Sequence, residues 1–263
     1  MKMWRVRKLM VWLACGLYGV GAVARAGEHV PAGYDGPAER LHVYLLIGQS
    51  NMAGRAPWAP EEAGVMERVY LLNGADDWEP ARNPLNRYST IRKEIGLQRL
   101  NPGYTFALAM TEADPAVTVG LVVNARGGTG IQEWARGTRF YNEALQRTRR
   151  AQQTGQLAGI LWHQGEGDFQ DPQYLDKLIR LIADLREDLD APELPFVAGQ
   201  IYAEPGLNVQ IARLPDLVPF TGVAGSEDLR VMDRWHFDAE SMRQLGRRYA
   251  EAMREVGDFG LQE

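Results

Sequence analysis

A serine, an aspartate and a histidine stand in polar segments far apart along the chain, and together they are the residue types that acyl transfer requires. Ser50 lies in the segment IGQSNMAGR, and Asp233 and His236 lie in DRWHFD. A serine hydroxyl is a poor nucleophile unless a base takes its proton and an acid orients that base. A serine after a strand also commonly serves only as a turn or helix cap. Ser50 is therefore a candidate nucleophile only if a base reaches it.

Two of the four histidines are candidates for that base, because the other two lie before or at the start of the first predicted strand. His163 ends the apolar run GILWH, which is also typical of a buried histidine. His236 follows Asp233 by three residues, so one turn of chain can bring the carboxylate onto the ring. The spacing favours His236 as the base and Asp233 as its acid, and Glu166 in HQGEGD is an alternative acid.

The segment HQGEGD also permits a different chemistry. Glu166 and Asp168 supply two carboxylates, the residue types that glycoside hydrolysis uses. Two residues apart on one loop, they need not straddle a sugar, and this hypothesis leaves Ser50 and His236 without a role. No H-E-x-x-H or comparable ligand spacing occurs, so no catalytic metal is expected.

Acyl transfer also needs N–H groups aimed at the oxyanion, each contributing about 2.7 to 4 kcal/mol when preorganised. The backbone N–H of Ser50 is one candidate. The segment NARGGTG offers others, because glycine lets a main-chain N–H approach a ligand closely. The side-chain amides of Gln164 and Asn124 are further candidates.

An α/β sheet is the scaffold that brings these segments together. Apolar runs predict strands at 42–47, 68–72, 117–123, 159–162 and 196–201, and helical periodicity predicts helices at 104–113, 140–153, 171–189 and 239–256. Alternating strands and helices indicate an open parallel sheet covered on both faces. The segments GQSNMAG, NARGGTG and HQGEGD each follow a strand, so they should converge at the carboxyl edge of the sheet.

The beginning of the chain has the features of a secretory signal peptide. Basic residues precede an apolar run, and Ala24-Arg25-Ala26 suits the cleavage site. We therefore expect a signal peptide over 1–26, a linker over 27–40, one domain over 41–263, and export to the periplasm or the medium. The apolar run is shorter than the ~20 residues of a membrane span, so no stable membrane association is expected after cleavage.

Composition excludes several classes of function. The only cysteine, Cys15, lies in the predicted leader, so the mature chain should have no disulfide and no thiolate chemistry. The formal net charge of −5 lacks the excess of positive charge that is typical of nucleic-acid-binding proteins, so no nucleic-acid partner is expected. The sequence does not indicate an oligomeric state.

Four segments in order resemble the blocks of SGNH-type esterases: IGQSNMAGR, NARGGTGIQEW, WHQGEGD and DRWHFD. The likeness is greatest to the branch that contains sialate O-acetylesterases and acetylxylan esterases, and it spans residues 47–238. It implies a flavodoxin-like three-layer α/β/α sandwich with a parallel sheet of about five strands. It also implies Ser50 as nucleophile, His236 as base, and Asp233 ahead of Glu166 as the acid.

The same resemblance implies an oxyanion hole formed by the N–H groups of Ser50 and Gly128 and by the side-chain amide of Gln164. The general SGNH pattern has asparagine at that third position, whereas this branch has glutamine. Arg55, Trp58 and Trp134 are expected to line the surface that receives the sugar.

The resulting hypothesis is an exported serine esterase that removes acetyl groups from a carbohydrate through an acetyl-serine intermediate, without a cofactor. The alternatives are a carbohydrate-binding protein without turnover on the same fold, and the glycosidase that would use Glu166 and Asp168. Likeness of fold does not select the sugar, which could be sialic acid, xylan or a related glycan.

Overall fold

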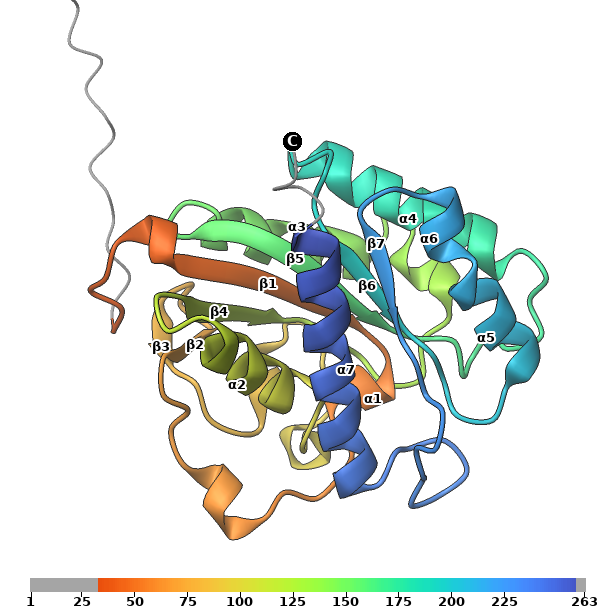
Figure 1. The fold of residues 1–263 in the computed structure, drawn as a ribbon, viewed down its shortest axis with the longest axis horizontal. Helices are drawn as coiled ribbons and strands as arrows, with labels where there is room; N and C mark the ends of the chain where they lie inside the picture. Colours follow the sequence, from red (N-terminus) through yellow and green to blue (C-terminus); the bar gives the residue numbers. More distant parts are fainter. Residues whose placement is uncertain (1–32, 259–263) are drawn as a thin grey trace, which may run out of the picture.

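A single sheet runs through the centre of the computed structural model, which describes residues 33–258 (Figure 1). The predicted signal peptide and residues 27–32 of the predicted linker lie outside the described residues. Within them the sheet has seven strands in the order β3-β2-β4-β1-β5-β6-β7. The strands are β1 (Leu41–Gly48), β2 (Val69–Leu72), β3 (Trp78–Pro80), β4 (Thr118–Val123), β5 (Gln156–His163), β6 (Phe196–Gly199) and β7 (Thr221–Ala224).

Helices cover both faces of this sheet, which confirms the three-layer α/β/α sandwich. Figure 1 shows α2 and α7 in front of the sheet and α3 and α4 behind it. The helices are α1 (Ser50–Ala53), α2 (Gly103–Ala113), α3 (Arg139–Ala151), α4 (Tyr174–Asp188), α5 (Pro205–Ala212), α6 (Leu214–Leu217) and α7 (Ala239–Asp258). The 3₁₀ helices are η1 (Ala38–Arg40), η2 (Pro60–Ala63), η3 (Leu85–Tyr88), η4 (Ile95–Leu97) and η5 (Ile131–Trp134).

The sheet differs from the sequence-based expectation in strand number, since seven strands are present where about five were expected. β3 and β7 were not predicted, because β3 has only three residues and includes a proline, and β7 has the weakly apolar sequence TGVA. β3 is antiparallel to β2, whereas the other pairings are parallel. A flavodoxin-like sheet has the order 2-1-3-4-5. Here the run β4-β1-β5-β6-β7 has this order, and β2 and β3 extend the sheet beyond β4.

The continuous apolar character of β1 follows from burial on both faces. Val43, Leu45 and Ile47 belong to the core beneath α3 and α4, whereas Tyr44 and Leu46 belong to the core beneath α2 and α7. All five side chains are at most 2% exposed. A parallel strand covered on both faces needs apolar side chains at successive positions.

The candidate site lies where the direction of the chain connections changes. After β1 the chain passes to β2 on the β4 side of the sheet, and after β5 it passes to β6 on the opposite side. β1 and β5 are neighbours, so a crevice between their following loops is expected there. The loops are also tied together, since Gln49 N–H donates to the His163 carbonyl at 2.8 Å and Arg126 N–H to the Gly48 carbonyl at 3.0 Å.

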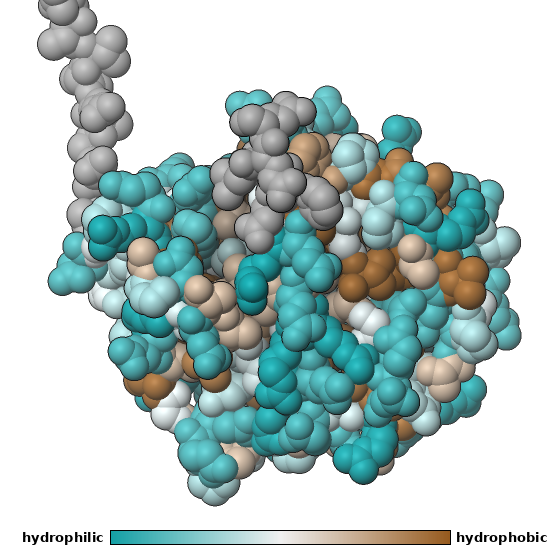
Figure 2. Space-filling view, viewed as in Figure 1, coloured by the Kyte–Doolittle hydropathy of each residue, from teal (hydrophilic) through white to brown (hydrophobic). Residues whose placement is uncertain are grey.

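The face of the molecule drawn in Figure 2 is predominantly polar. Figure 2 shows hydrophilic side chains over most of the visible face, with apolar residues in small patches. Among residues 33–258 no helix combines the length and the apolar character that crossing a membrane requires. Within the predicted linker, Tyr34 is buried and its ring contacts that of Tyr70.

Gly48 is expected to be indispensable for the strand end that carries the candidate site. Its φ is +134°, and a Cβ there would collide with the backbone of His163. We predict that Gly48→Ala lowers the free energy of unfolding by about 2–4 kcal/mol, measured by urea denaturation. Gly64→Ala is the matched control, because its Cβ would meet only the Glu61 carbonyl at 3.8 Å. Equal stabilities for the two variants would contradict the prediction.

Candidate active site

A pocket of about 450 Å³ lies at the carboxyl edge of β4, β1 and β5. All three predicted polar segments contribute to it, and so does the segment that carries the histidine. The lining residues are Gln49, Ser50, Arg55, Lys93, Leu97, Gly127, Gly128, Glu166, Gly167, Trp235 and His236. The topology has therefore assembled residues that are up to 187 positions apart in the sequence, counting from Gln49 to His236.

Ser50 is the first residue of α1 and directly follows the loop that leaves β1. It is only 6% exposed, yet it lines the pocket. At the first position of a helix the backbone N–H has no intrahelical acceptor. Among residues 33–258 no acceptor is found for this N–H, so it is available to a ligand in the pocket.

His236 and Asp233 form a local pair. The Nδ1 atom of His236 lies 2.7 Å from Asp233 Oδ2, and Asp233 Oδ1 accepts the backbone N–H groups of Trp235 and His236, each at 2.8 Å. Burial by itself raises the pKa of Asp233, but the hydrogen bonds from the His236 ring and from both N–H groups outweigh it and lower that pKa. An ionised carboxylate only accepts hydrogen bonds, so Nδ1 carries a proton, and in the neutral ring Nε2 is then the acceptor.

The Ser50 hydroxyl and the His236 ring share the pocket without a hydrogen bond between them in the described residues. The His236 side chain is 22% exposed. Catalytic hydrogen bonds are often long in an enzyme without substrate and shorten in the complex, so this separation is compatible with proton transfer.

Glu166 and His163 form a second, buried pair behind the pocket. His163 is fully buried and its Nδ1 lies 3.1 Å from the hydroxyl of Tyr249. Its Nε2 lies 3.6 Å from Glu166 Oε1, beyond hydrogen-bond distance, and Glu166 Oε1 accepts Asn51 Nδ2–H at 2.6 Å. The structure thus gives the His236 ring Asp233 as its carboxylate partner and directs Glu166 to Asn51. His163, the other histidine considered as the base, does not line the pocket.

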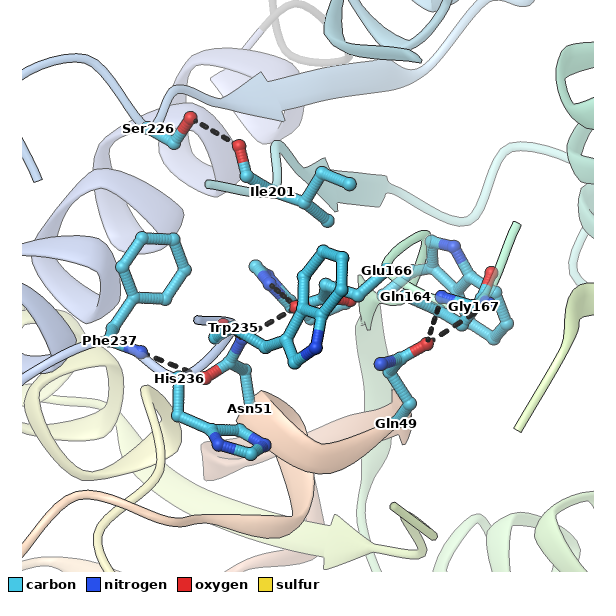
Figure 3. Close-up of polar contacts among 12 residues, drawn as sticks. Gln49, Asn51, Gln164, Glu166, Gly167, Ile201, Ser226, Trp235, His236 and Phe237 are labelled. Carbon is cyan, nitrogen blue, oxygen red and sulfur yellow. Dashed lines mark hydrogen bonds and ion pairs between the residues drawn. The ribbon is translucent and has the colours of Figure 1, made fainter. Parts of the chain in front are cut away.

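The side-chain amide that faces the pocket belongs to Gln49, whereas the sequence predicted Gln164. The Gln164 Nε2 donates to Gln49 Oε1 at 3.1 Å and to the Thr129 carbonyl at 3.0 Å, and it also contacts Asp168. Its N–H groups are therefore occupied within the protein. Figure 3 shows the Gln49 oxygen turned toward Gln164 and Gly167 and its nitrogen turned toward the His236 side of the site.

Further donors come from the loop after β4. Gly128 has φ +74°, a conformation that favours glycine, and the N–H groups of Gly127 and Gly128 donate no hydrogen bond within residues 33–258. A Cβ at Gly127 would lie 3.3 Å from the Cβ of Ser50 and would collide with the Arg55 guanidinium. The loop backbone is therefore in close contact with the candidate nucleophile.

The aromatic side chain at the pocket is also a different one from those predicted. Trp134 is fully buried, packs edge-on against Trp162 and donates to the Thr129 hydroxyl at 3.1 Å, so it supports the loop instead of meeting a sugar. Trp58 packs against the core and does not line the pocket, whereas Arg55 does line it. The pocket-lining aromatic is Trp235, whose ring lies 5.9 Å from that of Phe169.

The two carboxylates of the glycosidase hypothesis do not face each other across the pocket. Asp168 Oδ2 accepts the Ile131 N–H at 2.8 Å and contacts the Gln164 amide, and Asp168 is absent from the pocket lining. Among residues 33–258 no three histidine, cysteine, aspartate or glutamate side chains form a cluster suited to a metal ion.

Comparison with known proteins identifies the family. The family model described as carbohydrate esterase, sialic acid-specific acetylesterase matches residues 40–255. The chain belongs to this carbohydrate esterase family. This membership shows that the protein is an ester hydrolase, called the esterase below. It also confirms the resemblance drawn from the four sequence blocks.

Relatives of the esterase agree with this membership. A probable carbohydrate esterase of Arabidopsis thaliana is 32% identical over 257 residues, which cover 88% of this chain and 97% of the relative. The X-ray structure of an Arabidopsis thaliana protein superposes with a TM-score of 0.74 at 27% identity, covering 84% of this chain and 100% of that one. A carbohydrate acetylesterase from Xanthomonas citri superposes with a TM-score of 0.60 at 20% identity, and the match covers 83% of this chain and 57% of the Xanthomonas citri chain. At this identity the likeness supports the fold alone.

Sequence reasoning missed four residues that the structure of the esterase brings to the site. Gln49 and Asn51 flank Ser50, and Trp235 precedes His236, so adjacency to the predicted residues was the available signal. Lys93 comes from a loop between η3 and η4 that carries no motif. Only the tertiary structure brings that loop to the pocket.

Proposed function

We propose that this protein is an exported serine esterase that hydrolyses acetyl esters on a carbohydrate through an acetyl-serine intermediate. The observation that carries the proposal is the 2.7 Å contact between His236 Nδ1 and Asp233, made while the ring and Ser50 line one pocket. That contact leaves Nε2 as the ring nitrogen able to take a proton. A serine, a histidine and a carboxylate in this relation have the roles of a catalytic triad.

In this mechanism His236 Nε2 takes the Ser50 proton as the serine oxygen attacks the acetyl carbonyl carbon. The oxyanion accepts hydrogen bonds from the N–H groups of Ser50 and Gly128 and from the Gln49 amide. His236 then gives its proton to the sugar oxygen as the acetyl–sugar bond breaks. Water attacks the acetyl-serine with His236 again as the base, which releases acetate and restores Ser50.

Positive charge in the pocket supports a sugar that itself carries a carboxylate, such as an O-acetylated sialic acid. Arg55 Nη1 donates to the carbonyls of Gly54 at 2.7 Å and Leu97 at 2.9 Å, and burial lowers the pKa of its guanidinium. A Cβ at Gly128 would lie 3.4 Å from Lys93 Nζ. Among residues 33–258 neither cation forms an ion pair, so both charges remain available to an anionic substrate.

Acetate release tests this function. The purified protein and Ser50→Ala are incubated with 4-nitrophenyl acetate, an O-acetylated sialic acid and acetylated xylan. Release from at least one glycan that disappears in Ser50→Ala is the expected result. The absence of release from every acetylated glycan would favour a carbohydrate-binding protein.

N-terminal sequencing of protein recovered from the periplasm or medium checks export, and cleavage after Ala26 is expected.

The charge of Lys93 is expected to matter for acidic substrates alone. Lys93→Gln should raise KM for an O-acetylated sialic acid about tenfold or more and leave KM for 4-nitrophenyl acetate within about twofold, because hydrogen bonds to charged groups contribute ~1.5–3 kcal/mol. Steady-state kinetics on both substrates measure this difference. Lys177→Gln, on α4 and outside the pocket, is the control. An equal rise in KM for both substrates would refute a carboxylate contact.

A further inference from the structure

We propose that Asn51 is a positioning residue that holds His236 in place relative to Ser50, and that Glu166 sets the orientation of the Asn51 amide. This inference rests on the proposed function, since it takes His236 as the base that acts on Ser50. It concerns a part of the site that neither the pairing of His236 with Asp233 nor the oxyanion donors explain.

Asn51 connects α1, the helix that begins at Ser50, to both peptide groups that flank His236. Its Nδ2 donates to the Trp235 carbonyl at 3.1 Å, and its Oδ1 accepts the Phe237 N–H at 3.2 Å. Asn51 is fully buried and directly follows Ser50 in α1. One side chain therefore fastens the backbone on each side of the base to the residue next to the nucleophile (Figure 3).

Asp233 does not supply this positioning. It lies on the same loop as His236, and its three hydrogen bonds all go to Trp235 or His236 itself. The pair can orient the ring, but it would move as a unit if the loop shifted. Phe237 is fully buried and anchors the end of the loop in the core. The hydrogen bonds from Asn51 fix how the intervening peptides face α1.

Glu166 determines which way the Asn51 amide points. Its Oε1 accepts Asn51 Nδ2–H at 2.6 Å, so the amide nitrogen faces Glu166 and Trp235 and the amide oxygen faces Phe237. With the amide reversed, an oxygen would face the carboxylate and the Trp235 carbonyl, and an N–H would face the Phe237 N–H. Glu166 is 6% exposed, which makes such unmatched contacts costly.

This role requires an acceptor oxygen at position 166 but not a charge. Glutamine has the same shape as glutamate and presents an amide oxygen to Asn51, whereas leucine fills a similar space with no acceptor. A carboxylate that took part in the chemistry would not be replaced by glutamine. The pair Glu166→Gln and Glu166→Leu therefore separates positioning from direct participation.

The test measures kcat, KM and Tm of the full chain with 4-nitrophenyl acetate. Asn51→Ala should lower kcat about 100-fold and leave KM within about threefold, since a displacement of about 1 Å can cost that much. Glu166→Leu should lower kcat at least tenfold, and Glu166→Gln should restore kcat to within about threefold of the unmodified enzyme. This split between kcat and KM, together with rescue by glutamine, would not result from a merely structural role.

Asn208→Ala is the matched control. Asn208 likewise bonds two backbone groups, the N–H of Ile201 at 3.0 Å and its carbonyl at 2.8 Å, but it lies outside the pocket. This variant should lower Tm and leave kcat unchanged. A folded Asn51→Ala with unchanged kcat would overturn the inference, and so would a Glu166→Gln as impaired as Glu166→Leu.

Failure of the proposed function gives a different result. If Ser50→Ala keeps full acetate release, the serine mechanism fails whatever Asn51 does. If Ser50→Ala is inactive and Asn51→Ala retains its kcat, only the positioning inference fails. Should Asn51→Ala not fold, the two Glu166 variants decide the question.

Discussion

Replacing Ser50 with alanine is expected to lower kcat for 4-nitrophenyl acetate by about 10⁴-fold or more, with KM changed little. Loss of the nucleophile removes the acetyl-enzyme pathway, and only the oxyanion donors and substrate binding remain to assist water. Steady-state kinetics measure the loss. Mass spectrometry of the unmodified enzyme after rapid quenching should detect an acetyl group on the peptide that contains Ser50.

His236→Ala provides the matched comparison for Ser50. Because the two residues act in one proton transfer, the double variant should be about as impaired as either single variant. Additive losses would indicate two independent mechanisms. A Ser50→Ala enzyme that keeps more than about a tenth of kcat would disprove the nucleophile assignment.

Asp233→Asn is expected to lower kcat by between about 10² and 10⁴. An asparagine amide at this position can donate to His236 Nδ1, which moves the ring proton to Nε2 and removes the base. The Asp233 side chain is 50% exposed, so water can partly replace it, and the loss should be smaller than in a buried triad. Kinetics with 4-nitrophenyl acetate measure the effect.

Asp238→Asn is the control for the same loop. Asp238 accepts the Ser241 N–H at 2.8 Å at the start of α7, and asparagine can make the same hydrogen bond. We expect kcat within about threefold of the unmodified enzyme. A comparable loss in both variants would mean that the loop had been distorted and would remove the support for Asp233 as the acid.

The depressed pKa of Asp233 also predicts a direction for stability. A carboxyl whose pKa is lower in the folded than in the unfolded state stabilises the fold above its ordinary pKa. That contribution is lost as the pH falls through the lower, folded-state pKa. Urea unfolding of the unmodified protein and Asp233→Asn from neutral to acidic pH should converge at the acidic end. A gap that widens on acidification would contradict this sign.

The sequence by itself determined the parts of the site that depend on contacts between residues close together in the chain. Asp233 and His236 are three residues apart, so one turn of chain suffices to pair them, and the structure has that pair at 2.7 Å. The strands preceding the segments of Ser50, Gly128 and Glu166 are apolar runs, and parallel strands place their following loops at one edge. The location of the site at the carboxyl edge of the sheet, the pairing of Asp233 with His236 and the layered architecture were therefore predictable.

Only the tertiary structure decided which side chains at that edge face the pocket. Gln49 and Gln164 are both near the edge, and their mutual hydrogen bond leaves the amide of Gln49, not that of Gln164, directed toward the site. Trp134 was expected at a sugar surface, but its contact with Trp162 of β5 buries it. These outcomes depend on contacts between segments distant in sequence, and local patterns do not encode them.

The distinction between local sequence pattern and long-range contacts also applies to strand order and to the residues around Ser50. The position of β4 between β2 and β1 is set by packing across the whole sheet, whereas the apolar run of β4 itself is local. Asn51 follows the predicted nucleophile directly, yet its hydrogen bonds span 115 positions to Glu166 and 186 to Phe237. Local spacing thus specified the chemistry available to this chain, and long-range hydrogen bonding decided how that chemistry is held in place.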